Sequence, residues 1–395
     1  MLERPMSKGG WTRVRFDQIA TQINDRVDNP AEAGVERYVG LEHLDPDSLR
    51  IRRWGEPTDV ESTKLRFQPG DIIFGKRRVY QRKVAVADFE GICSAHAMVL
   101  RAKPGAVLPE FLPFFMQSDL FMERALSISV GSLSPTINWT ALAAEEFLLP
   151  PIQEQARLVE TLASMEQYHS ALNHLASEAG RVFTSLSYEL FDVSSAAKAR
   201  LADLVDYASD GPFGSKLKTN HYADSGTRVV RLNNIAPNRF VFDDEAYIPI
   251  SYFESELRRY EVKPGDVVIA GLGDEDIPAG RSCVVPSNLG LSINKADCFC
   301  LRTNNTTDAR YLSYYLNSPM GLAQAKVFSQ GTTRIRLNLE NIKKFMVPRV
   351  DLSVQLQVVE KLNSARSAWD QALARTARLG EFQRTLLNSQ FLAQQ

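Results

Sequence analysis

Basic side chains in this chain come in short clusters with polar and aromatic residues among them. The densest cluster spans residues 76–83, where lysines and arginines surround Tyr80. Guanidinium and ammonium groups bind phosphate oxygens, and neighbouring hydroxyl or amide groups can hydrogen-bond to the edges of bases. A run of charges is equally typical of a solvated surface, so one such cluster leaves both interpretations open.

The second half of the chain carries clusters of the same kind, and this repetition favours a functional role. The residues predicted to contact DNA are Lys76, Arg77, Arg78, Tyr80, Arg82, Ser132, Ser134, Lys216, Lys218, Arg231, Asn233, Arg334 and Arg336. The formal net charge of −1 is mild counter-evidence, because nucleic-acid-binding proteins are more often basic. Local patches matter more than the sum of charges, so this argument does not decide the question.

No pattern in the sequence predicts catalysis. A phosphate-binding loop of the form G-x-x-x-x-G-K-[ST] is absent. The Gly-Leu-Gly stretch at 271–273 lacks the third glycine of a dinucleotide-binding turn, so an ordinary loop is the better explanation. Asp71 and Lys76 do not make a nuclease pair, because the second half has no lysine at the matching position. Asp71 and Asp266 each follow Pro-Gly and are expected to shape turns.

The cysteines and the termini give no sign of a metal site or a membrane segment. The four cysteines form no C-x-x-C pair, and the five histidines do not lie at zinc-binding spacing beside them. We expect reduced, buried thiols and no bound metal. No apolar run approaches the roughly 18 residues that span a bilayer, and the first residues lack the apolar core of a signal peptide. The expected location is the cytoplasm.

The chain repeats itself once. Residues 112–118 match 312–318, and 155–162 match 355–362, both at an offset of 200 residues. The Pro-Gly-Asp triplets at 69–71 and 264–266 are offset by 195 residues, and such drift indicates loop insertions within a common fold. The sequence therefore predicts a duplicated module.

Each module combines a domain of short strands and helices with a long helix introduced by proline. The predicted fold class is α+β, with two tandem mixed domains whose long helices pack as an antiparallel coiled coil. The predicted boundaries are a flexible N-terminus at 1–10, a first domain at 11–150, a first helix at 151–192, a linker at 193–200, a second domain at 201–349 and a second helix at 350–395.

Both long helices carry apolar residues at seven-residue intervals, the pattern of a coiled-coil seam. The residues predicted to pack helix against helix are Leu158, Leu162, Met165, His169, Leu172, Gly180, Leu186, Val358, Leu362, Trp369, Leu379, Gly380 and Leu386. The second seam weakens at Gln383, where it either continues or shifts to Phe382. Gly180 and Gly380 mark either a tolerated kink or a close approach of the helices.

Several short motifs in the two modules occur in the same order. The first copy has Gly-Ser-Leu-Ser-Pro-Thr-Ile-Asn at 131–138 and Leu-Pro-Pro-Ile-Gln-Glu-Gln at 149–155; the second has Gly-Thr-Thr-Arg-Ile-Arg-Leu-Asn at 331–338, Val-Pro at 347–348 and Gln355. In this arrangement the chain resembles the specificity subunit of Type I restriction–modification systems, from about Trp11 to Phe391. The second copy departs from the pattern where it lacks the Pro-x-x-Glu-Gln form.

The resemblance implies two target-recognition domains that each read half of a bipartite sequence in double-stranded DNA. It implies helices that dock two methyltransferase subunits, with a restriction and translocase subunit as a further possible partner. The chain itself would be non-catalytic and bind no cofactor, and S-adenosylmethionine, ATP and magnesium would belong to its partners. The helices would hold half-sites about 34–36 Å apart, one turn of DNA.

Two alternatives come from other functional classes. A structural adaptor whose duplicated domains bind proteins would fit the near-zero net charge. A methyltransferase in its own right is more remote, because the sequence lacks a cofactor-binding glycine motif.

Overall fold

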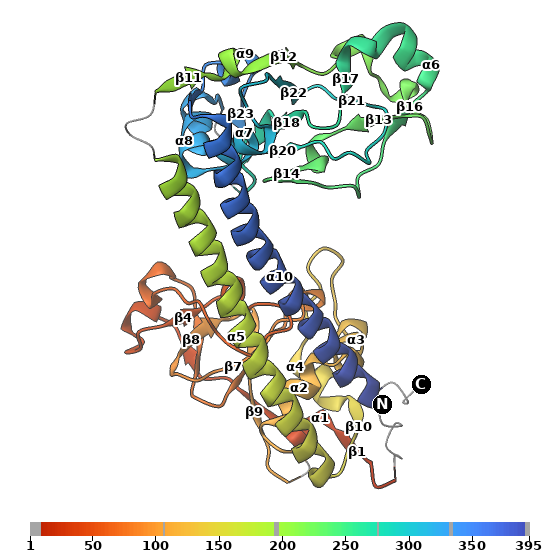
Figure 1. Ribbon diagram of the computed structural model, residues 1–395. Coiled ribbons are helices and arrows are strands. Elements are labelled where there is room, and N and C mark those ends of the chain that lie inside the picture. Colours follow the sequence, from red (N-terminus) through yellow and green to blue (C-terminus); the bar gives the residue numbers. More distant parts are fainter. Residues whose placement is uncertain (1–8, 106, 193–196, 275, 332–334, 392–395) are drawn as a thin grey trace. The chain divides into compact units, whose positions relative to one another are not determined.

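The computed structural model describes residues 9–105, 107–192, 197–274, 276–331 and 335–391 (Figure 1). The chain divides into two compact units, which we call unit 1 (residues 1–173 and 374–395) and unit 2 (residues 174–373). The two long helices, α5 (Ile152–Phe191) and α10 (Leu352–Phe391), each contribute a stretch to both units. The sequence-predicted boundaries instead gave each long helix a segment of its own. The two divisions differ because, in each unit, a stretch of α5 and a stretch of α10 pack against each other and against the strands and short helices of that unit.

Unit 1 contains two four-stranded sheets and a two-stranded ribbon. The first sheet is antiparallel, in the order β2 (Ala20–Ile23), β9 (Ala97–Ala102), β6 (Ile72–Gly75), β7 (Val84–Val86). The second has the order β3 (Arg26–Val27), β5 (Lys64–Phe67), β8 (Gly91–Ser94), β4 (Tyr38–Val39), with β4 parallel to β8. The ribbon pairs β1 (Thr12–Arg15) with β10 (Glu146–Leu149).

Unit 2 repeats the strand order of the first sheet and three neighbouring strands of the second, but the fourth strand of its second sheet lies at the opposite side. Its first sheet is β12 (Val205–Ser209), β22 (Cys298–Thr303), β18 (Val267–Ala270), β20 (Ser282–Val284). Its second is β16 (Tyr247–Ile248), β13 (Thr227–Val230), β21 (Ser292–Asn294), β17 (Glu261–Val262), again with one parallel pair, β13 and β21. Its ribbons are β11 (Lys198–Arg200) with β24 (Met346–Pro348), β14 (Ile235–Ala236) with β15 (Arg239–Phe240), and β19 (Leu272–Gly273) with β23 (Ile335–Arg336).

Short helices pack on the first sheet of each unit. In unit 1 they are α1 (Phe16–Ile19), α2 (Phe111–Gln117), α3 (Asp119–Ser127) and α4 (Trp139–Ala144). In unit 2 they are α7 (Ala309–Leu316), α8 (Pro319–Phe328) and α9 (Leu339–Ile342), whereas Tyr252 of α6 (Ile250–Tyr252) packs against the core of the second sheet. Ser118 and Ser318 are N-caps of α3 and α8, where the hydroxyl oxygen accepts a backbone hydrogen bond from Phe121 (3.3 Å) and Gly321 (3.2 Å). This shared cap explains part of the match between 112–118 and 312–318.

The central strand of each first sheet has side chains in two cores. Ile72 and Phe74 of β6 lie in the core shared with α2 and α3, whereas Ile73 lies in the core shared with the second sheet. Val267 and Val268 of β18 divide in the same way. Alternate residues of a strand point to opposite faces, so a strand buried on both faces is continuously apolar. This accounts for the apolar run after each Pro-Gly-Asp.

The aspartate of each Pro-Gly-Asp triplet closes its turn and also binds an arginine. The carboxylate of Asp71 accepts from the backbone N–H of Gln68 at 2.9 Å, and that of Asp266 accepts from Lys263 at 2.8 Å. Both aspartates are buried, and each receives two hydrogen bonds from an arginine: Arg101 on β9 and Arg302 on β22. The preceding glycines have φ of +89° and +88°, which favours glycine. The expected turn is present, and the arginine pair is an addition that the sequence pattern did not reveal.

A buried glutamine near the start of each long helix ties that helix to the domain before it. The side-chain oxygen of Gln155 accepts from the backbone N–H of Leu108, and that of Gln355 accepts from Asp308, both at 2.8 Å. The Gln355 amide nitrogen donates to the carbonyls of Thr306 and Val350. The same contact therefore forms in both copies, although the second copy lacks the Pro-x-x-Glu-Gln pattern.

The long helices run antiparallel within each unit (Figure 1). In unit 1 the early α5 residues Leu158 and Leu162 share a core with the late α10 residues Leu387 and Phe391. In unit 2 the late residues of α5 share a core with the early residues of α10, including Phe191 and Leu362. The α+β fold class and the antiparallel helix pairing are confirmed.

Every seam residue predicted from the heptad pattern is buried or half-buried. At the weak end of the second seam Gln383 stays on the buried side, at 9% exposed, while Phe382 is 51% exposed, so the seam does not shift. A Cβ added to Gly180 would lie 3.0 Å from the ring of Trp369, and one added to Gly380 would lie 3.7 Å from His169. Gly180 therefore marks a close approach of the two helices, in which the ring of Trp369 on α10 lies against α5.

Candidate nucleic-acid interface

One edge of the first sheet gathers loops in each unit. Because neighbouring strands are antiparallel, the end of β6, the end of β2 and the start of β9 lie at the same edge of unit 1. The loop 76–83 and His96 are therefore neighbours there. The corresponding edge of unit 2 carries the loops 210–214, 271–281 and 295–297. We call these the reading edges of unit 1 and unit 2.

A second segment of the chain pairs with the loop at each reading edge. The backbone N–H of Arg78 donates to Pro135 at 2.8 Å, and that of Ile137 donates to Lys76 at 3.0 Å. In unit 2 the backbone N–H of Leu337 donates to Gly271 at 2.8 Å, and β19 pairs with β23. The basic loop and the Gly-Ser-Leu-Ser-Pro-Thr motif, which are far apart in the sequence, are thus brought together.

The reading edge of unit 1 is positively charged. Among the described residues, no carboxylate forms an ion pair with Lys76, Arg77 or Arg78. A guanidinium N–H of Arg77 lies 3.1 Å from Nε2 of His96, and a guanidinium can only donate, so this imidazole nitrogen accepts. Partial burial and then the positive charges of Arg77 and Lys76 lower the pKa of His96. Burial also lowers the pKa of Lys76. Cations that no described carboxylate neutralises, next to a histidine whose pKa is lowered, suit an anionic ligand.

Arg82, which the sequence predicted as a DNA contact, forms ion pairs and a hydrogen bond within unit 1. Its side chain is 16% exposed and pairs with Asp47 and Asp119, each at 2.9 Å, and it donates to the carbonyl of Gln117 at 2.5 Å. Arg78 and Arg82 flank a 3-10 turn at Val79–Gln81 and both have left-handed backbone, with φ of +57° and +55°. Such conformations cost of order 1–3 kcal/mol each and concentrate at functional sites. Arg82 therefore holds the strained loop, while Tyr80 at its tip is 54% exposed.

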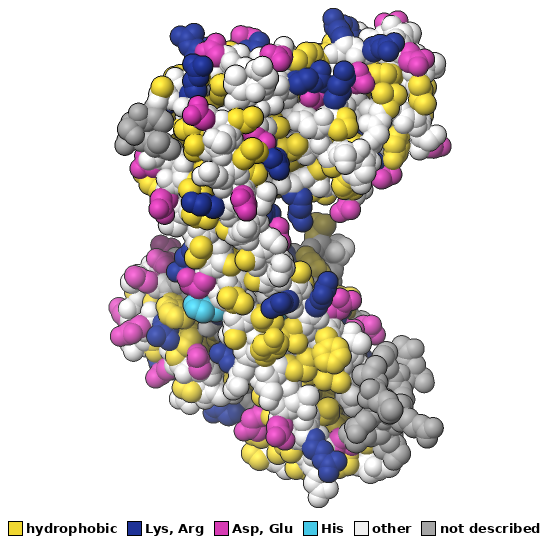
Figure 2. All heavy atoms as spheres, in the orientation of Figure 1, with side chains coloured by type: hydrophobic (Ala, Val, Ile, Leu, Met, Phe, Trp, Pro, Cys, Tyr) yellow, Lys and Arg dark blue, Asp and Glu magenta, His cyan; other side chains and the backbone are white. Residues whose placement is uncertain are grey.

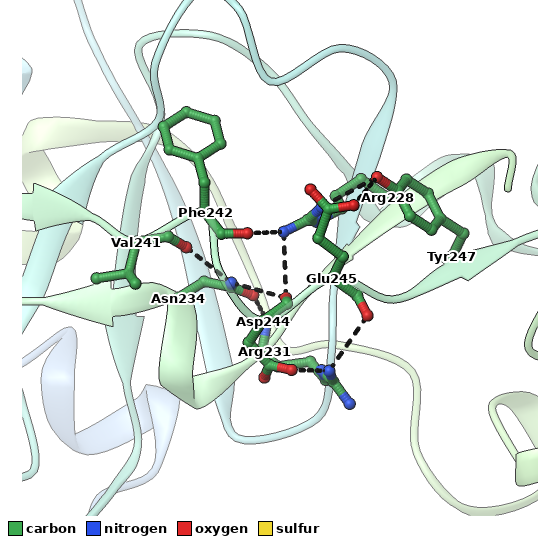
Figure 3. A network of polar contacts seen from close by, with 8 residues as sticks. All are labelled: Arg228, Arg231, Asn234, Val241, Phe242, Asp244, Glu245 and Tyr247. Atoms are coloured by element: carbon green, nitrogen blue, oxygen red, sulfur yellow. Dashed lines mark hydrogen bonds and ion pairs between the residues drawn. The ribbon is translucent and has the colours of Figure 1, made fainter. Parts of the chain in front are cut away.

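Arg231 of unit 2 and the neighbouring Arg228 also form ion pairs and hydrogen bonds within their own unit (Figure 3). Arg228 is 4% exposed and donates to the carbonyls of Phe242 (2.8 Å) and Asp244 (3.1 Å). Its other terminal nitrogen, Nη1, pairs with the carboxylate of Glu245 and donates to the hydroxyl of Tyr247. Arg231 pairs with the carboxylate of Asp244. Both guanidinium groups therefore fix the loop 241–245, and the DNA contact predicted for Arg231 stays a prediction.

The other predicted contacts have varied surroundings. Lys216, Lys218, Asn233 and Ser132 are exposed, and Ser134 is half-buried. Arg336 lies at the reading edge of unit 2 and is exposed, but it pairs with Asp297 at 2.8 Å. Arg334 lies outside the described residues.

Sequence reasoning missed His96 and Asp210, which lie at the reading edges of unit 1 and unit 2. His96 is next to β9 in the chain, and Asp210 follows β12 directly. Their proximity to the other loops depends on the order of strands in the sheet. The signal that could have identified them is their place beside strand ends, combined with a sheet order that one sequence does not supply.

The structure shows no metal centre or membrane helix among the residues that it describes. No group of three or more His, Cys, Asp or Glu residues could hold a metal ion in those ranges. No helix there is both long enough and apolar enough to cross a bilayer. The four cysteines are buried and unpaired, and burial raises the pKa of Cys93, Cys283 and Cys298 to about 12.

Comparisons with known proteins lead to one family. The domain family described as "Type I restriction modification DNA specificity domain" matches residues 58–178. The Type I restriction enzyme EcoDI specificity subunit of Escherichia coli is 26% identical over 245 residues, which cover 58% of this chain and 53% of that protein. This chain thus spans about half the length of that relative. The putative Type I restriction enzyme MjaX specificity subunit of Methanocaldococcus jannaschii is 22% identical over 390 residues, covering 89% of this chain and 83% of that protein.

Two solved structures share the fold. The Type I restriction–modification S subunit of M. genitalium has a TM-score of 0.58 at 15% identity, with 99% of this chain and 97% of that chain covered. A chain from a structural study of assembly and conformational transition in a Type I R-M system has a TM-score of 0.59 at 18% identity, covering 97% and 98%. The order of motifs, the family match and the duplicated fold agree. In its match to this domain family at residues 58–178 and in its fold, this chain is similar to the specificity subunits of Type I restriction–modification systems.

Proposed function

We propose that the chain recognises a bipartite DNA sequence for a Type I restriction–modification complex, with each unit reading one half of the target. The observation that carries this proposal is the reading edge of unit 1, where Lys76, Arg77 and Arg78 lie beside the 131–138 motif. Cations without carboxylate partners among the described residues suit phosphates, and adjacent hydroxyl and amide groups suit base edges. The repeated scaffold provides a second edge for the second half of the target.

We propose further that the helices dock methyltransferase subunits. Tyr168, Leu175 and Val182 recur every seven residues along α5 and are 50–59% exposed. They form a second apolar stripe beside the seam residues that face α10, and exposed apolar stripes of this kind mark interaction surfaces. Figure 2 shows hydrophobic side chains interspersed with charged ones on the face that it draws. A partner helix could cover this stripe.

In this proposal the chemistry belongs to the partners. The methyltransferase subunits would bind S-adenosylmethionine, and a restriction and translocase subunit would use ATP and magnesium. The raised thiol pKa values reduce the fraction of thiolate on this chain, which makes its cysteines poor nucleophiles.

A domain exchange tests the bipartite arrangement. Replacing residues 202–348 with the matching segment of another specificity subunit should change one half of the methylated sequence and leave the other half unchanged. Methylation-site mapping of the complex formed with the methyltransferase subunit reads this out directly. Changes in both halves would contradict independent reading by the two units.

The adaptor function remains the second candidate, because the net charge is close to zero. A gel shift with the methyltransferase partner present separates the two functions. Sequence-specific retention of a DNA duplex supports recognition, and retention that is equal for all duplexes, or none, supports the adaptor.

A further inference from the structure

A small cleft opens at the reading edge of unit 2, beside the loop that follows β12. Its volume is about 420 Å³, and its lining includes Tyr207, Asp210, Phe213, Arg259 and Tyr260. Phe213 is 47% exposed at its rim. The cleft thus combines one carboxylate with several aromatic rings and a guanidinium group.

The walls of the cleft are held in place. The hydroxyl of Tyr207 donates to the carbonyl of Arg259 at 2.5 Å and lies 2.8 Å from the hydroxyl of Ser209. The guanidinium of Arg259 lies 4.7 Å from the ring centroid of Tyr260 and donates to its hydroxyl at 2.5 Å. Gly211 packs against the neighbouring loop so closely that a Cβ would overlap the carbonyl group of Lys295. The position of Asp210 is therefore fixed from both sides.

Asp210 differs from the other acidic side chains around it. Asp297 pairs with Arg336, and Asp266 pairs with Arg302. Asp210 forms no hydrogen bond or ion pair with any residue that the structure describes, and its Oδ1 atom is buried. Burial raises the pKa of this carboxyl group, while Lys343 and Arg336 act in the opposite direction. An acceptor left unsatisfied in this way is unfavourable, and a bound donor would remove that penalty.

A hydrogen-bond donor from DNA fits this position better than a phosphate does. A carboxylate repels phosphate oxygens, but in the major groove it accepts from the exocyclic amino group of a base. Aromatic rings around it can make apolar contacts with a thymine methyl group in the same groove. The same sheet edge in unit 1 carries the basic loop, so the cleft lies on the surface that corresponds to the candidate DNA interface.

We propose that Asp210 is a specificity-determining residue, which accepts a hydrogen bond from the exocyclic amino group of a cytosine or an adenine in the half-site read by unit 2. This inference rests on the proposed function. It adds that one position of the second half-site owes its base preference to this carboxylate.

The test compares Asp210→Asn with Asp203→Asn, a matched control. Asp203 precedes β12 at the opposite edge of the same sheet, is exposed, and has the same charge to lose. The complex with the methyltransferase subunit is used to select duplexes in which each half-site in turn is randomised. Thermal unfolding of each variant confirms that the fold is retained, and Asp210→Ala provides a second variant without an amide.

Wild type and Asp203→Asn should select the same sequence. Asp210→Asn should lower the preference for the amino-bearing base at one position of the second half-site about tenfold, or about 1.4 kcal/mol, because one base contact is weakened. The identity of that base distinguishes cytosine from adenine. Unchanged selection by both Asp210 variants overturns this inference and leaves the proposed function intact. Selection of no sequence by the wild type overturns the proposed function itself.

Discussion

At the reading edge of unit 1 the loop after β6 begins with Lys76-Arg77-Arg78, whereas the loop after β18 in unit 2 begins with Gly-Leu-Gly at 271–273 and continues with Asp274. The backbone contacts of the two loops are the same: Lys76 accepts from Ile137, and Gly271 accepts from Leu337. One scaffold therefore supports edges of different charge. Shared residues maintain the strand pairing and turns, and the side chains in the loops remain free to differ.

The charge difference has a consequence for binding. Unit 1 presents cations directly at its reading edge, so the phosphate and base contacts that we propose for it would come from adjacent residues. In unit 2 the exposed lysines Lys216 and Lys218 lie in the loop after Asp210, while Asp297 and Asp274 lie at the edge itself. We expect the salt dependence of DNA binding to come mainly from unit 1, and a larger share of base discrimination from unit 2.

The strongest test of the shared scaffold removes the aspartate of each Pro-Gly-Asp turn. Asp71→Ala and Asp266→Ala should each lower the free energy of unfolding by about 2–3 kcal/mol, because a buried carboxylate with charged and backbone donors is lost. Urea unfolding followed by circular dichroism measures the change. Losses of clearly unequal size would mean that the two turns do not have equivalent roles.

A smaller effect is expected from the cations at the edges. Arg77→Ala should weaken DNA binding about tenfold at low salt and reduce the slope of log K against log salt by about one, as for a lost phosphate contact. Arg336→Ala should change the slope less, because Asp297 already neutralises that guanidinium. Binding titrations at several salt concentrations provide both numbers. An unchanged slope in Arg77→Ala would exclude this arginine from the interface.

The smallest effect concerns pH and should be confined to unit 1. The pKa of His96 is lowered in the free protein, so a phosphate placed nearby would raise it and binding would take up a proton. Affinity should therefore rise as the pH falls from about 7.5 to 6, by roughly two- to threefold. In His96→Gln this increment should disappear. A pH dependence that persists in that variant would point to another titrating group.

The regular parts of this fold could be predicted from the sequence. Heptad spacing placed residues such as Leu162 and Leu362 on the seam, and the repeat placed the Pro-Gly-Asp strands in equivalent positions. These patterns depend on local periodicity, which a single sequence contains. The confirmed fold class follows from them, whereas the resemblance to Type I specificity subunits depends on the order of the short motifs in the two copies.

Sequence patterns could not predict which of the basic side chains form ion pairs with carboxylates. Arg82 and Arg231 lie in the same kind of basic cluster as Arg77, yet the structure pairs them with Asp47, Asp119 and Asp244. Arg77 has no such partner among the described residues. Whether an arginine meets a carboxylate depends on which loops share a sheet edge, and that is a property of the tertiary fold.

The buried glutamine near the start of α10 bears on how such proteins diversify. All three hydrogen bonds of the Gln355 side chain involve backbone groups, those of Thr306, Asp308 and Val350. A backbone N–H or carbonyl is present whatever the side chain, so this anchor places little demand on the sequence that it holds. Recombination could therefore join an unrelated recognition module to the same helix without a compensating mutation in α10. A new DNA target could then arise in one step.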